Sequence, residues 1–466
     1  MIPARLKAIG LAVYPRLPVG FQNALCTLEG LRRNGWRYGG RQREWEALFR
    51  AAATWDEPRV RSFQDAKLRA VVRHAAERVP YYRKRFAELG VQAEDFRGVE
   101  DITRLPVLTR EDLRTHWRDL IADGWPASHL WAHASGGSTG MPITIVTSRE
   151  AMEVEYGFYW ARRRPGVART DPFATFTANP IVPANQKRPP FWRDNWAARQ
   201  RLYSVFHLSD ETIPAYVEDL DRRPCAYWQG YPSVVHTLAE WVLQNGYPFR
   251  NRIRAFFSTS EVLQPGWRET IERAFGCRVW NQYGQGEAAA SITEYDCGHL
   301  HVDHDYGVVE LWPVGQEDGL VRAEVVATAL HNLAWPLIRY RVGDLVLYDP
   351  SERCAAGRPG PVIRAIEGRT SQFFALPDGR RITSLMGLSI HCRNARSIQV
   401  VQERPGAIRI HVVPAPEFSE ADREHLIAVF RSRLGEDVSM EVTLADRPIL
   451  TQAGKFLAII NRLPDS

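Results

Sequence analysis

The middle of this chain alternates between strand-like and helix-like segments, and this alternation constrains the fold more than any other feature. Short runs rich in β-branched and aromatic residues stand between longer runs whose apolar residues recur at helical spacing. The strand-like runs are 173–177, 255–258, 279–283, 308–312 and 322–326, and the helical runs are 212–220, 232–244 and 265–275. This order predicts an α/β fold with a substantially parallel sheet.

The end of the chain has a different character. Short strand-like runs lie at 398–401, 408–413 and 438–443. They surround a helix that we expect to begin at a capping box of Ser419 and Asp422 and to end at Gly435. We therefore expect two domains: a large N-terminal domain, 1–367, with mixed and parallel sheets and helices, and a small α+β domain, 368–466.

The first part of the chain is mainly helical in pattern. Helical spacing of apolar residues predicts helices at 62–78, 81–89 and 152–164. Thr109 and Asp112 form a capping pattern that predicts the start of another helix. The segment 152–164 carries Tyr156, Tyr159 and Trp160, whose rings either line a substrate pocket or pack in the core.

The charge balance suits a phosphorylated ligand. The chain has 466 residues with 60 basic and 54 acidic side chains, a net charge of +6 at pH 7. No dense run of Lys and Arg accompanies this excess, so we do not expect nucleic acid as a partner. Arg162, Arg163 and Arg164 precede Pro165, and we interpret this triplet as a solvated helix end.

The cysteines and the apolar runs indicate the cellular compartment in which we expect the protein. The six cysteines are scattered without the spacing of a disulfide framework, which indicates reduced thiols and a cytoplasmic location. No apolar run reaches the ~18–20 residues needed to span a bilayer. A short apolar patch at 9–13 is flanked by Arg5, Lys7 and Arg16, so we expect at most peripheral membrane association.

A glycine-rich loop, ASGGSTGMP at 134–142, is the first candidate site. It combines glycines and hydroxyl residues, namely Ser135, Gly136, Gly137, Ser138, Thr139 and Gly140. Glycines let successive backbone N–H groups turn toward an anion, and the hydroxyls add donors, so the loop could cradle phosphates; an ordinary surface turn is the alternative. The strand-like run after it predicts that the loop joins two strands.

Three further loops follow predicted strands, where catalytic residues of α/β folds gather. They read STSE at 258–261, NQYGQGE at 281–287 and RYRVGD at 339–344. Two more polar stretches lie near the end of the chain, IEGRTSQ at 366–372 and TQAGKF at 451–456.

Taken together, these motifs resemble those of the adenylate-forming enzymes, and most closely the phenylacetate–CoA ligase and CapK branch. The resemblance extends from the region of Tyr81 to Lys455. It implies that Ser135, Gly137, Ser138, Thr139 and Gly140 hold the ATP phosphates. Met141 stands where the family usually has a lysine, which removes one cation from that loop.

The resemblance also assigns roles to the later loops. It implies that Tyr283, with Gln282 and Gly284, packs on adenine and that Glu287 helps to hold Mg²⁺. Asp344 would accept hydrogen bonds from the ribose hydroxyls. Three further nucleotide contacts are carried over, from Ser260 and Glu261 beside the adenine and from Arg369 near the ribose.

Lys455 is the expected catalytic lysine in this resemblance. A cation that arrives on a mobile C-terminal domain can stabilise the negative charge that builds at the α-phosphate. The hinge motif before that domain departs from the family pattern, because Thr370, Ser371 and Gln372 stand where Asp residues are common.

A second candidate site lies in the segment CGHLHVD at 297–303. Part of the family binds a structural zinc through a Cys and a His here and a later Cys-x-Cys-Gly. Here the later element is Cys354, Ala355, Ala356, Gly357, so one thiolate is missing. The alternatives are a degenerate site without zinc and a tetrahedral set of Cys297, His299, His301 and Cys354.

The resemblance implies an enzyme that uses ATP, Mg²⁺ and CoA. It would adenylate an aryl or other lipophilic carboxylic acid, release pyrophosphate, and pass the acyl group to CoA. Three alternatives remain: transfer of the acyl group to an amine, hydroxyl or carrier protein, transfer of AMP to a hydroxylated acceptor, and an inactive nucleotide-binding partner. The 15 Trp, 16 Tyr and 19 Phe suit a lipophilic pocket but do not identify the acid.

Overall fold

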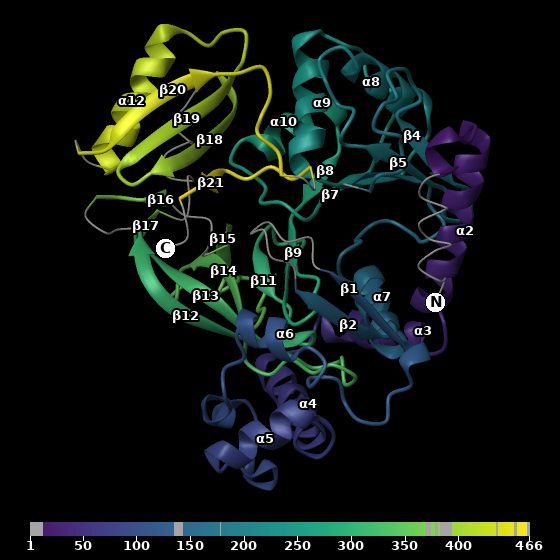
Figure 1. The fold of residues 1–466 in the computed structure, drawn as a ribbon, viewed down its shortest axis with the longest axis vertical. Helices are drawn as coiled ribbons and strands as arrows, with labels where there is room; N and C mark the ends of the chain where they lie inside the picture. The colour runs from purple at the N-terminus through teal and green to yellow at the C-terminus, as the bar shows by residue number, and fades with distance from the viewer. Residues whose placement is uncertain are drawn as a thin grey trace. The chain divides into compact units, whose positions relative to one another are not determined.

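The computed structural model describes residues 13–134, 143–177, 179–369, 374–377, 381–382, 394–434, 437–451 and 454–463 (Figure 1). The chain groups into two compact units. The first comprises Met1–Pro172, Arg193–Arg201 and Trp280–Ile366, and the second comprises Phe173–Trp192, Leu202–Val279 and Glu367–Ser466. The chain thus changes unit next to the boundary expected at 367, but the second unit also takes two middle segments. The division into 1–367 and 368–466 remains a prediction.

The helices of the first unit are α2 (Val19–Arg37), α3 (Gln42–Ala52), α4 (Glu57–Arg78), α5 (Pro80–Leu89), α6 (Arg110–His116) and α7 (Arg149–Ala161). Three of them, α4, α6 and α7, begin at a side-chain cap, supplied by Asp56, Thr109 and Ser148. Pro80 is the first residue of α5, and Gly90 ends it in the left-handed region at φ 65°. The expected capping box before α6 is present, since Thr109 accepts from the Asp112 N–H and Asp112 accepts from that of Thr109.

The main sheet of the first unit has seven strands in the order β12-β13-β14-β15-β11-β10-β9. Their bounds are Gly307–Glu317, Leu320–Ala329, Tyr340–Tyr348, Ile363–Arg369, Leu300–Val302, Ser291–Glu294 and Gln282–Gly284. The pairings β12–β13, β13–β14, β10–β11, β9–β10 and β11–β15 are antiparallel. The runs at 308–312 and 322–326, taken as part of a parallel α/β pattern, therefore belong to an antiparallel sheet. Periodicity does not distinguish the two arrangements.

Helices α4 and α5 share one apolar core with this sheet. Leu68 and Val72 of α4 and Phe86 of α5 are buried with strand residues such as Val325. Tyr82 adds polar contacts, because its Oη donates to the Pro336 carbonyl at 3.2 Å and accepts from the Ile338 N–H at 2.9 Å. The strand segment before Tyr340 is thereby fixed to α5.

A separate hairpin flanks the glycine-rich loop. Strands β1 (Leu130–Ala134) and β2 (Thr144–Ser148) pair antiparallel over their whole length, from Leu130 opposite Ser148 to Ala134 opposite Thr144. The expectation that the loop joins two strands is confirmed. The loop residues, 135–142, lie outside the described residues.

The parallel sheet of the α/β pattern has six strands in the order β4-β5-β3-β6-β7-β8. Their bounds are Trp192–Asn195, Gln200–Ser204, Phe173–Thr177, Tyr227–Gly230, Ala255–Ser258 and Arg278–Trp280. Strands β3, β6 and β7 pair in parallel. Helices α8 (Ile213–Arg222), α9 (Pro232–Gln244) and α10 (Trp267–Phe275) contribute to the same core, with Val217, Val235 and Ile271 buried.

The strand expected at 279–283 is two strands. Strand β8 ends at Trp280 in the six-stranded sheet, and β9 begins at Gln282 in the seven-stranded sheet. Asn281 separates them: its N–H donates to Glu294 Oε2 at 2.9 Å and its carbonyl accepts from the Glu294 N–H at 3.0 Å.

The C-terminal part of the second unit has its own core. Strands β20 (Ser439–Leu444), β19 (Ala407–Pro414), β18 (Ala395–Arg404) and β21 (Ile459–Asn461) form a sheet beside helix α12 (Glu420–Leu434). Val400, Ile410, Leu426 and Phe430 are fully buried between them. The Ser419 and Asp422 capping box is present, while Gly435 lies outside the described residues. A short pair, β16 (Phe374–Ala375) and β17 (Arg381–Ile382), precedes this sheet.

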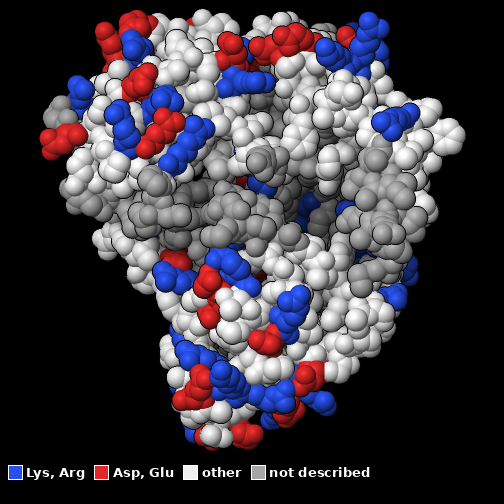
Figure 2. Space-filling model, in the orientation of Figure 1, with Lys and Arg blue, Asp and Glu red and all other residues white. Residues whose placement is uncertain are grey.

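The surface mixes charges of both signs. On the face shown in Figure 2, basic and acidic side chains alternate along α4 and α5, with no broad single-sign patch among the coloured residues. Within the part of the chain that the structure describes, no helix is long and apolar enough to cross a membrane.

Candidate functional site

Two of the expected nucleotide residues meet in the first unit. Tyr283 is the middle residue of β9, and its Oη donates a hydrogen bond of 2.7 Å to Asp344 Oδ2 on β14. Both residues are buried. The two residues are 61 positions apart in the sequence, and β15, β11 and β10 stand between their strands in the sheet order. A flat aromatic ring and a carboxylate are thus fixed side by side, as a base and a ribose diol require.

Glu287 follows β9 and is also buried. Its Oε1 accepts a hydrogen bond of 3.1 Å from the Tyr340 hydroxyl, the first residue of β14. The same oxygen lies 3.9 Å from Arg110 Nη1. A carboxylate oxygen is a hard ligand of the kind that Mg²⁺ prefers, so the residue type fits the expected metal.

Arg110 is a residue that the sequence reasoning missed. It is the first residue of α6, and all three guanidinium nitrogens are buried without a hydrogen-bond acceptor among the described residues. A buried guanidinium without acceptors is costly unless an anion satisfies it. Its one sequence signal was its place directly after the Thr109 cap.

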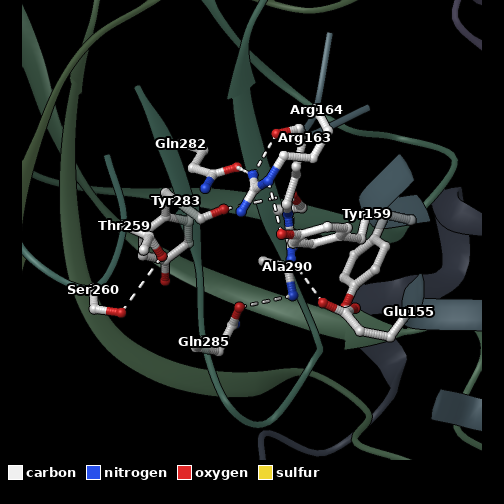
Figure 3. A network of polar contacts seen from close by, with 12 residues as sticks. Glu155, Tyr159, Arg163, Arg164, Thr259, Ser260, Gln282, Tyr283, Gln285 and Ala290 are labelled. Carbon is white, nitrogen blue, oxygen red and sulfur yellow. Dashed lines mark hydrogen bonds and ion pairs between the residues drawn. The ribbon is translucent and has the colours of Figure 1, made fainter. Parts of the chain in front are cut away.

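Arg163 and Arg164 lie beside Gln282 and Tyr283 of β9, as Figure 3 shows. Arg164 Nη1 donates to Gln282 Oε1 at 3.3 Å. Arg163 donates to Glu155 at 2.7 Å and to Ser291 at 3.1 Å. A Cβ at Gly284 would stand 2.9 Å from the Arg163 guanidinium, so the guanidinium would have to shift to make room for a side chain there.

The interpretation of residues 162–164 as a solvated helix end was wrong. Arg162 and Arg164 are buried, and Arg162 donates to Asp305 and lies 3.3 Å from Asp303. Nearby carboxylates keep the pKa of Arg162 above its usual value although burial opposes this. A run of arginines reads as a surface feature in sequence because their acidic partners are far away along the chain.

The first two arginines of RYRVGD have structural partners. Arg339 makes a paired contact with Glu310, at 2.9 and 2.8 Å, and donates to the Leu105 carbonyl. Arg341 makes a similar paired contact with Glu324, at 2.7 Å for both bonds. These contacts hold β14, which carries Asp344, against its neighbours.

Glu261 and Lys455 meet in the second unit. Glu261 Oε1 accepts a hydrogen bond of 2.6 Å from the Phe456 N–H, and its other oxygen accepts one of 3.3 Å from the Ser233 N–H. Burial raises the pKa of Glu261 to about 7, although these hydrogen bonds and the charge of Lys455 oppose the shift. Its neighbour Ser260 is exposed with φ 71°, in the left-handed region. Glu261 therefore holds the segment that carries the expected catalytic lysine.

Lys455 itself is half-buried, and its backbone closes a tight turn. The Lys455 N–H donates to Thr451 Oγ1 at 3.0 Å, and its carbonyl accepts from the Thr451 N–H at 2.9 Å. Gly454 fits this turn because its φ is 67° and a Cβ would meet Val205 at 2.9 Å.

The remaining residues expected at the nucleotide site fall, wholly or in their side chains, outside the part of the chain that the structure describes. Ser135, Gly137, Ser138, Thr139, Gly140 and Met141 lie outside the described residues. Arg369 is the last residue of β15, and its side chain is likewise outside the description.

The four residues considered for zinc do come together. Cys297, His299, His301 and Cys354 each present a ligand atom, and these atoms lie within 4.8 Å of one another. Cys297 Sγ is 3.5 Å from His301 Nε2. Two thiols and two imidazoles are a donor set suited to tetrahedral zinc, so the residues fit the metal despite the missing thiolate of the family pattern.

Comparison of the fold defines the class of protein. A crystal structure of 2-hydroxyisobutyryl-CoA ligase in the postadenylation state with 2-HIB-AMP matches with a TM-score of 0.67 at 20% identity, over 89% of this chain and 91% of that chain. The same ligase with 2-HIB-AMP and CoA in the thioesterification state matches with a TM-score of 0.54, over 88% and 91%. The fold is that of the adenylate-forming CoA ligases.

Sequence comparison narrows the class to one branch. Protein CapK of Staphylococcus aureus is 24% identical over 97% of this chain and 99% of its own length. Phenylacetate-coenzyme A ligase of Escherichia coli (strain K12) is 35% identical over 61% of this chain and 66% of its own length. Residues 378–462 match the family model of the CapK C-terminal domain. The chain is thus related to the adenylate-forming enzymes, within the branch of CapK and the phenylacetate–CoA ligases, as the motifs predicted.

Proposed function

We propose that this protein is an ATP-dependent adenylating enzyme that acts on a lipophilic or aryl carboxylic acid. An oxygen of the substrate carboxylate attacks the α-phosphorus of ATP, and the bond to the bridging oxygen of the β-phosphate breaks. Pyrophosphate leaves and acyl-AMP forms. The thiol of CoA then attacks the acyl carbon, and AMP leaves with the carboxylate oxygen. The relationship to phenylacetate–CoA ligases and the shared fold support this general reaction.

The observation that carries the proposal is the buried Tyr283–Asp344 pair. The Tyr283 hydroxyl donates to Asp344 Oδ2 at 2.7 Å, so the carboxylate is already oriented before nucleotide arrives. Its other oxygen can accept from a ribose diol while the Tyr283 ring covers the base. This arrangement suits a nucleoside better than a simple anion, because it offers a carboxylate rather than a cation.

Glu287 and Arg110 would face the phosphates. Magnesium, when bound, would neutralise phosphate charge and ease the departure of pyrophosphate, with Glu287 as its protein ligand. The Arg110 guanidinium, buried beside Glu287, supplies a cation that could compensate for Met141 in the glycine-rich loop. The loop residues Ser135, Gly137, Ser138, Thr139 and Gly140 would provide backbone and hydroxyl donors.

Lys455 would act on the reacting atoms of the first step. A lysine ammonium can hold the attacking carboxylate and stabilise the charge that builds at the α-phosphate. The Glu261 contact to the Phe456 N–H supports this role, because it fixes the backbone next to Lys455. Ser260, Gln282, Gly284 and Arg369 would complete the nucleotide site.

CoA is our proposal for the acceptor of the acyl group. The relatives named for CoA ligation match about two thirds of this chain, whereas CapK matches nearly all of it and its C-terminal domain model matches 378–462. Transfer to an amine, a hydroxyl or a carrier protein is therefore the second candidate.

The Cys297, His299, His301 and Cys354 cluster supports a structural zinc in the first unit. Zinc would tie the β10–β11 turn to the segment at Cys354, which strengthens the sheet that carries Tyr283. Elemental analysis of purified protein should find zinc at about one per chain. Cys354→Ser should lose that zinc, and zinc-free wild-type protein would contradict the assignment.

The test of the function is pyrophosphate release from ATP and Mg²⁺ across aryl, fatty and amino acids, with and without CoA. Release that depends on one acid class would establish adenylation and name the substrate class. Consumption of free thiol in the same reactions would identify CoA as the acceptor. Absence of release with every acid, by protein that still binds ATP, would contradict carboxylate adenylation.

A further inference from the structure

Helix α2 is turned so that its polar side faces the protein. Gln22 is buried and donates to the carbonyls of Tyr14 and Leu17, at 3.1 and 2.9 Å. Asn23 Oδ1 accepts from the Asp194 N–H at 3.0 Å. These side chains fix α2 to the segment at 193–196 through hydrogen bonds rather than through an apolar core.

Two smaller residues complete this inward face. Thr27 Oγ1 accepts from the Trp196 N–H at 3.1 Å. Gly30 is buried against Asn195, where a Cβ would come within 2.4 Å of the amide nitrogen. The side of α2 that faces the protein is therefore formed by Gln22, Asn23, Thr27 and Gly30.

The apolar side of α2 faces outward. Phe21, Leu25, Leu28 and Leu31 are 64%, 42%, 63% and 54% exposed. Their spacing of four, three and three residues places them along one side of the helix. Two further apolar residues are also exposed: Val13, before α2, is 45% exposed, and Trp196, in the segment at 193–196, is 56% exposed. We call these six residues the α2 stripe; they are half of the twelve large apolar side chains that are exposed among the described residues.

An amphipathic helix usually buries its apolar side, since that burial is the main source of its stability. Here the protein holds the helix by its polar side and leaves the apolar side in water. Large apolar side chains exposed in a row along a helix indicate a site of interaction. Helix α2 lies beside the marked N-terminal end of the chain in Figure 1.

The charge of the N-terminal segment indicates what kind of partner the α2 stripe binds. Residues 1–43 contain eight basic residues and one acidic residue, Glu29, so they carry +7 while the whole chain carries +6. Within the described part, Arg16, Arg32, Arg41 and Arg43 are exposed. Along the sequence, the positive charge is thus concentrated in the N-terminal segment that contains α2, where Arg32 and Arg41 also pair with Glu29 and Glu44.

We infer that the α2 stripe docks the protein on an anionic membrane surface. Leucine and aromatic side chains enter the boundary between headgroups and acyl chains, and arginines beside them attract acidic headgroups. A second copy of this chain is a poorer occupant, because two faces of the same positive charge would repel each other. The helix would lie on the membrane and not cross it. This inference is independent of the proposed reaction.

The test is co-sedimentation of the full chain with vesicles. Vesicles of phosphatidylcholine with phosphatidylglycerol should retain the protein, and vesicles of phosphatidylcholine alone should retain much less of it. Leu25→Gln combined with Leu28→Gln should weaken the binding about tenfold. Arg16→Gln combined with Arg43→Gln should weaken it less and reduce its salt dependence.

The matched control is Val314→Gln combined with Leu444→Gln, which removes two equally exposed apolar side chains elsewhere, at 54% and 52% exposure. This control should bind vesicles as the wild type does. Far-ultraviolet circular dichroism and thermal melting should be unchanged in every variant, because all these side chains are exposed. Wild-type protein that ignores anionic vesicles would overturn the inference. Equal binding by the stripe variant, or a wild-type dimer that this variant abolishes, would also overturn it.

Discussion

The two regions that carry the expected catalytic residues are built differently. Tyr283 and Asp344 are buried on strands of one sheet, Glu287 is buried in the turn after β9, and each is held by a side-chain hydrogen bond. Lys455 is half-buried on a turn, and its backbone N–H and carbonyl bond to Thr451 while the N–H of the next residue, Phe456, donates to Glu261. The first region is prepared before a ligand arrives, because its side chains are already hydrogen-bonded, whereas the described hydrogen bonds of the second hold backbone atoms of Lys455 and Phe456. This difference suits a preformed binding site and a catalytic group carried on its own segment.

The contrast between the two regions depends most on the catalytic role of Lys455. Lys455→Ala should lower adenylation by at least about 10²-fold with little change in ATP affinity, because the lost charge acts on the transition state. Pyrophosphate exchange and equilibrium ATP binding measure the two quantities. Arg409→Ala, an exposed cation on β19, is the control and should keep full activity. Near-normal exchange by Lys455→Ala would remove the role.

Glu261, which holds the backbone next to Lys455, can be tested through the pH dependence of protein stability. Burial raises the pKa of Glu261 from an ordinary value of 4.5 to about 7. The folded protein therefore holds this proton more tightly, so the stability that it contributes is present below pH 4.5 and is lost as pH rises through about 7. Glu261→Gln keeps an acceptor but does not titrate. Its stability relative to the wild type should therefore rise by up to about 3 kcal/mol between acidic and mildly alkaline pH.

Urea unfolding of Glu261→Gln and the wild type at pH values on both sides of that range measures the difference. A matched exposed substitution, Glu424→Gln on α12, should show no such dependence. The same difference at both pH values would mean that Glu261 is not the buried acid that the geometry indicates.

The prepared region is tested by removing one charge. Asp344→Asn keeps an acceptor for the Tyr283 hydroxyl but weakens the bonds to ribose, so AMP affinity should fall about tenfold. Isothermal titration with AMP measures this directly. Tyr283→Phe should have a smaller effect, because it frees Asp344 without removing its charge. Unchanged AMP affinity in Asp344→Asn would place the nucleotide elsewhere.

The smallest expected effect concerns Arg110, which we place at the phosphate end of the nucleotide site. Arg110→Gln should weaken ATP about fivefold and leave AMP almost unchanged, since the guanidinium faces the end that AMP lacks. The two affinities are measured in parallel. Arg114→Gln, one turn later on α6, is the control. An equal loss for AMP and ATP would show that Arg110 supports Glu287 structurally rather than meeting phosphate.

Sequence predicted the local elements with little error. Strands β3 and β7 and helix α9 coincide with the predicted ranges 173–177, 255–258 and 232–244. Both capping boxes formed as expected. These features depend on neighbouring residues only, which is why periodicity and capping patterns identify them.

The site was predicted in part. The motifs led to Tyr283, Glu287 and Asp344, and the structure brings the first and last into contact. It also brings together the four zinc donors that the sequence left undecided. Arg110, Arg163 and Arg164 were missed or misread, because their partners lie far away along the chain and no local pattern marks a buried arginine.

The sequence by itself determined which segments are strands and helices and which family their motifs resemble, because these depend on local spacing and residue type. Only the tertiary structure decided which arginines are buried, which strands are antiparallel, and which side of α2 faces outward. A helical pattern defines two faces, but the surrounding chain decides which one it covers. For α2, hydrogen bonds from the segment at 193–196 select the polar face and leave the leucines in water.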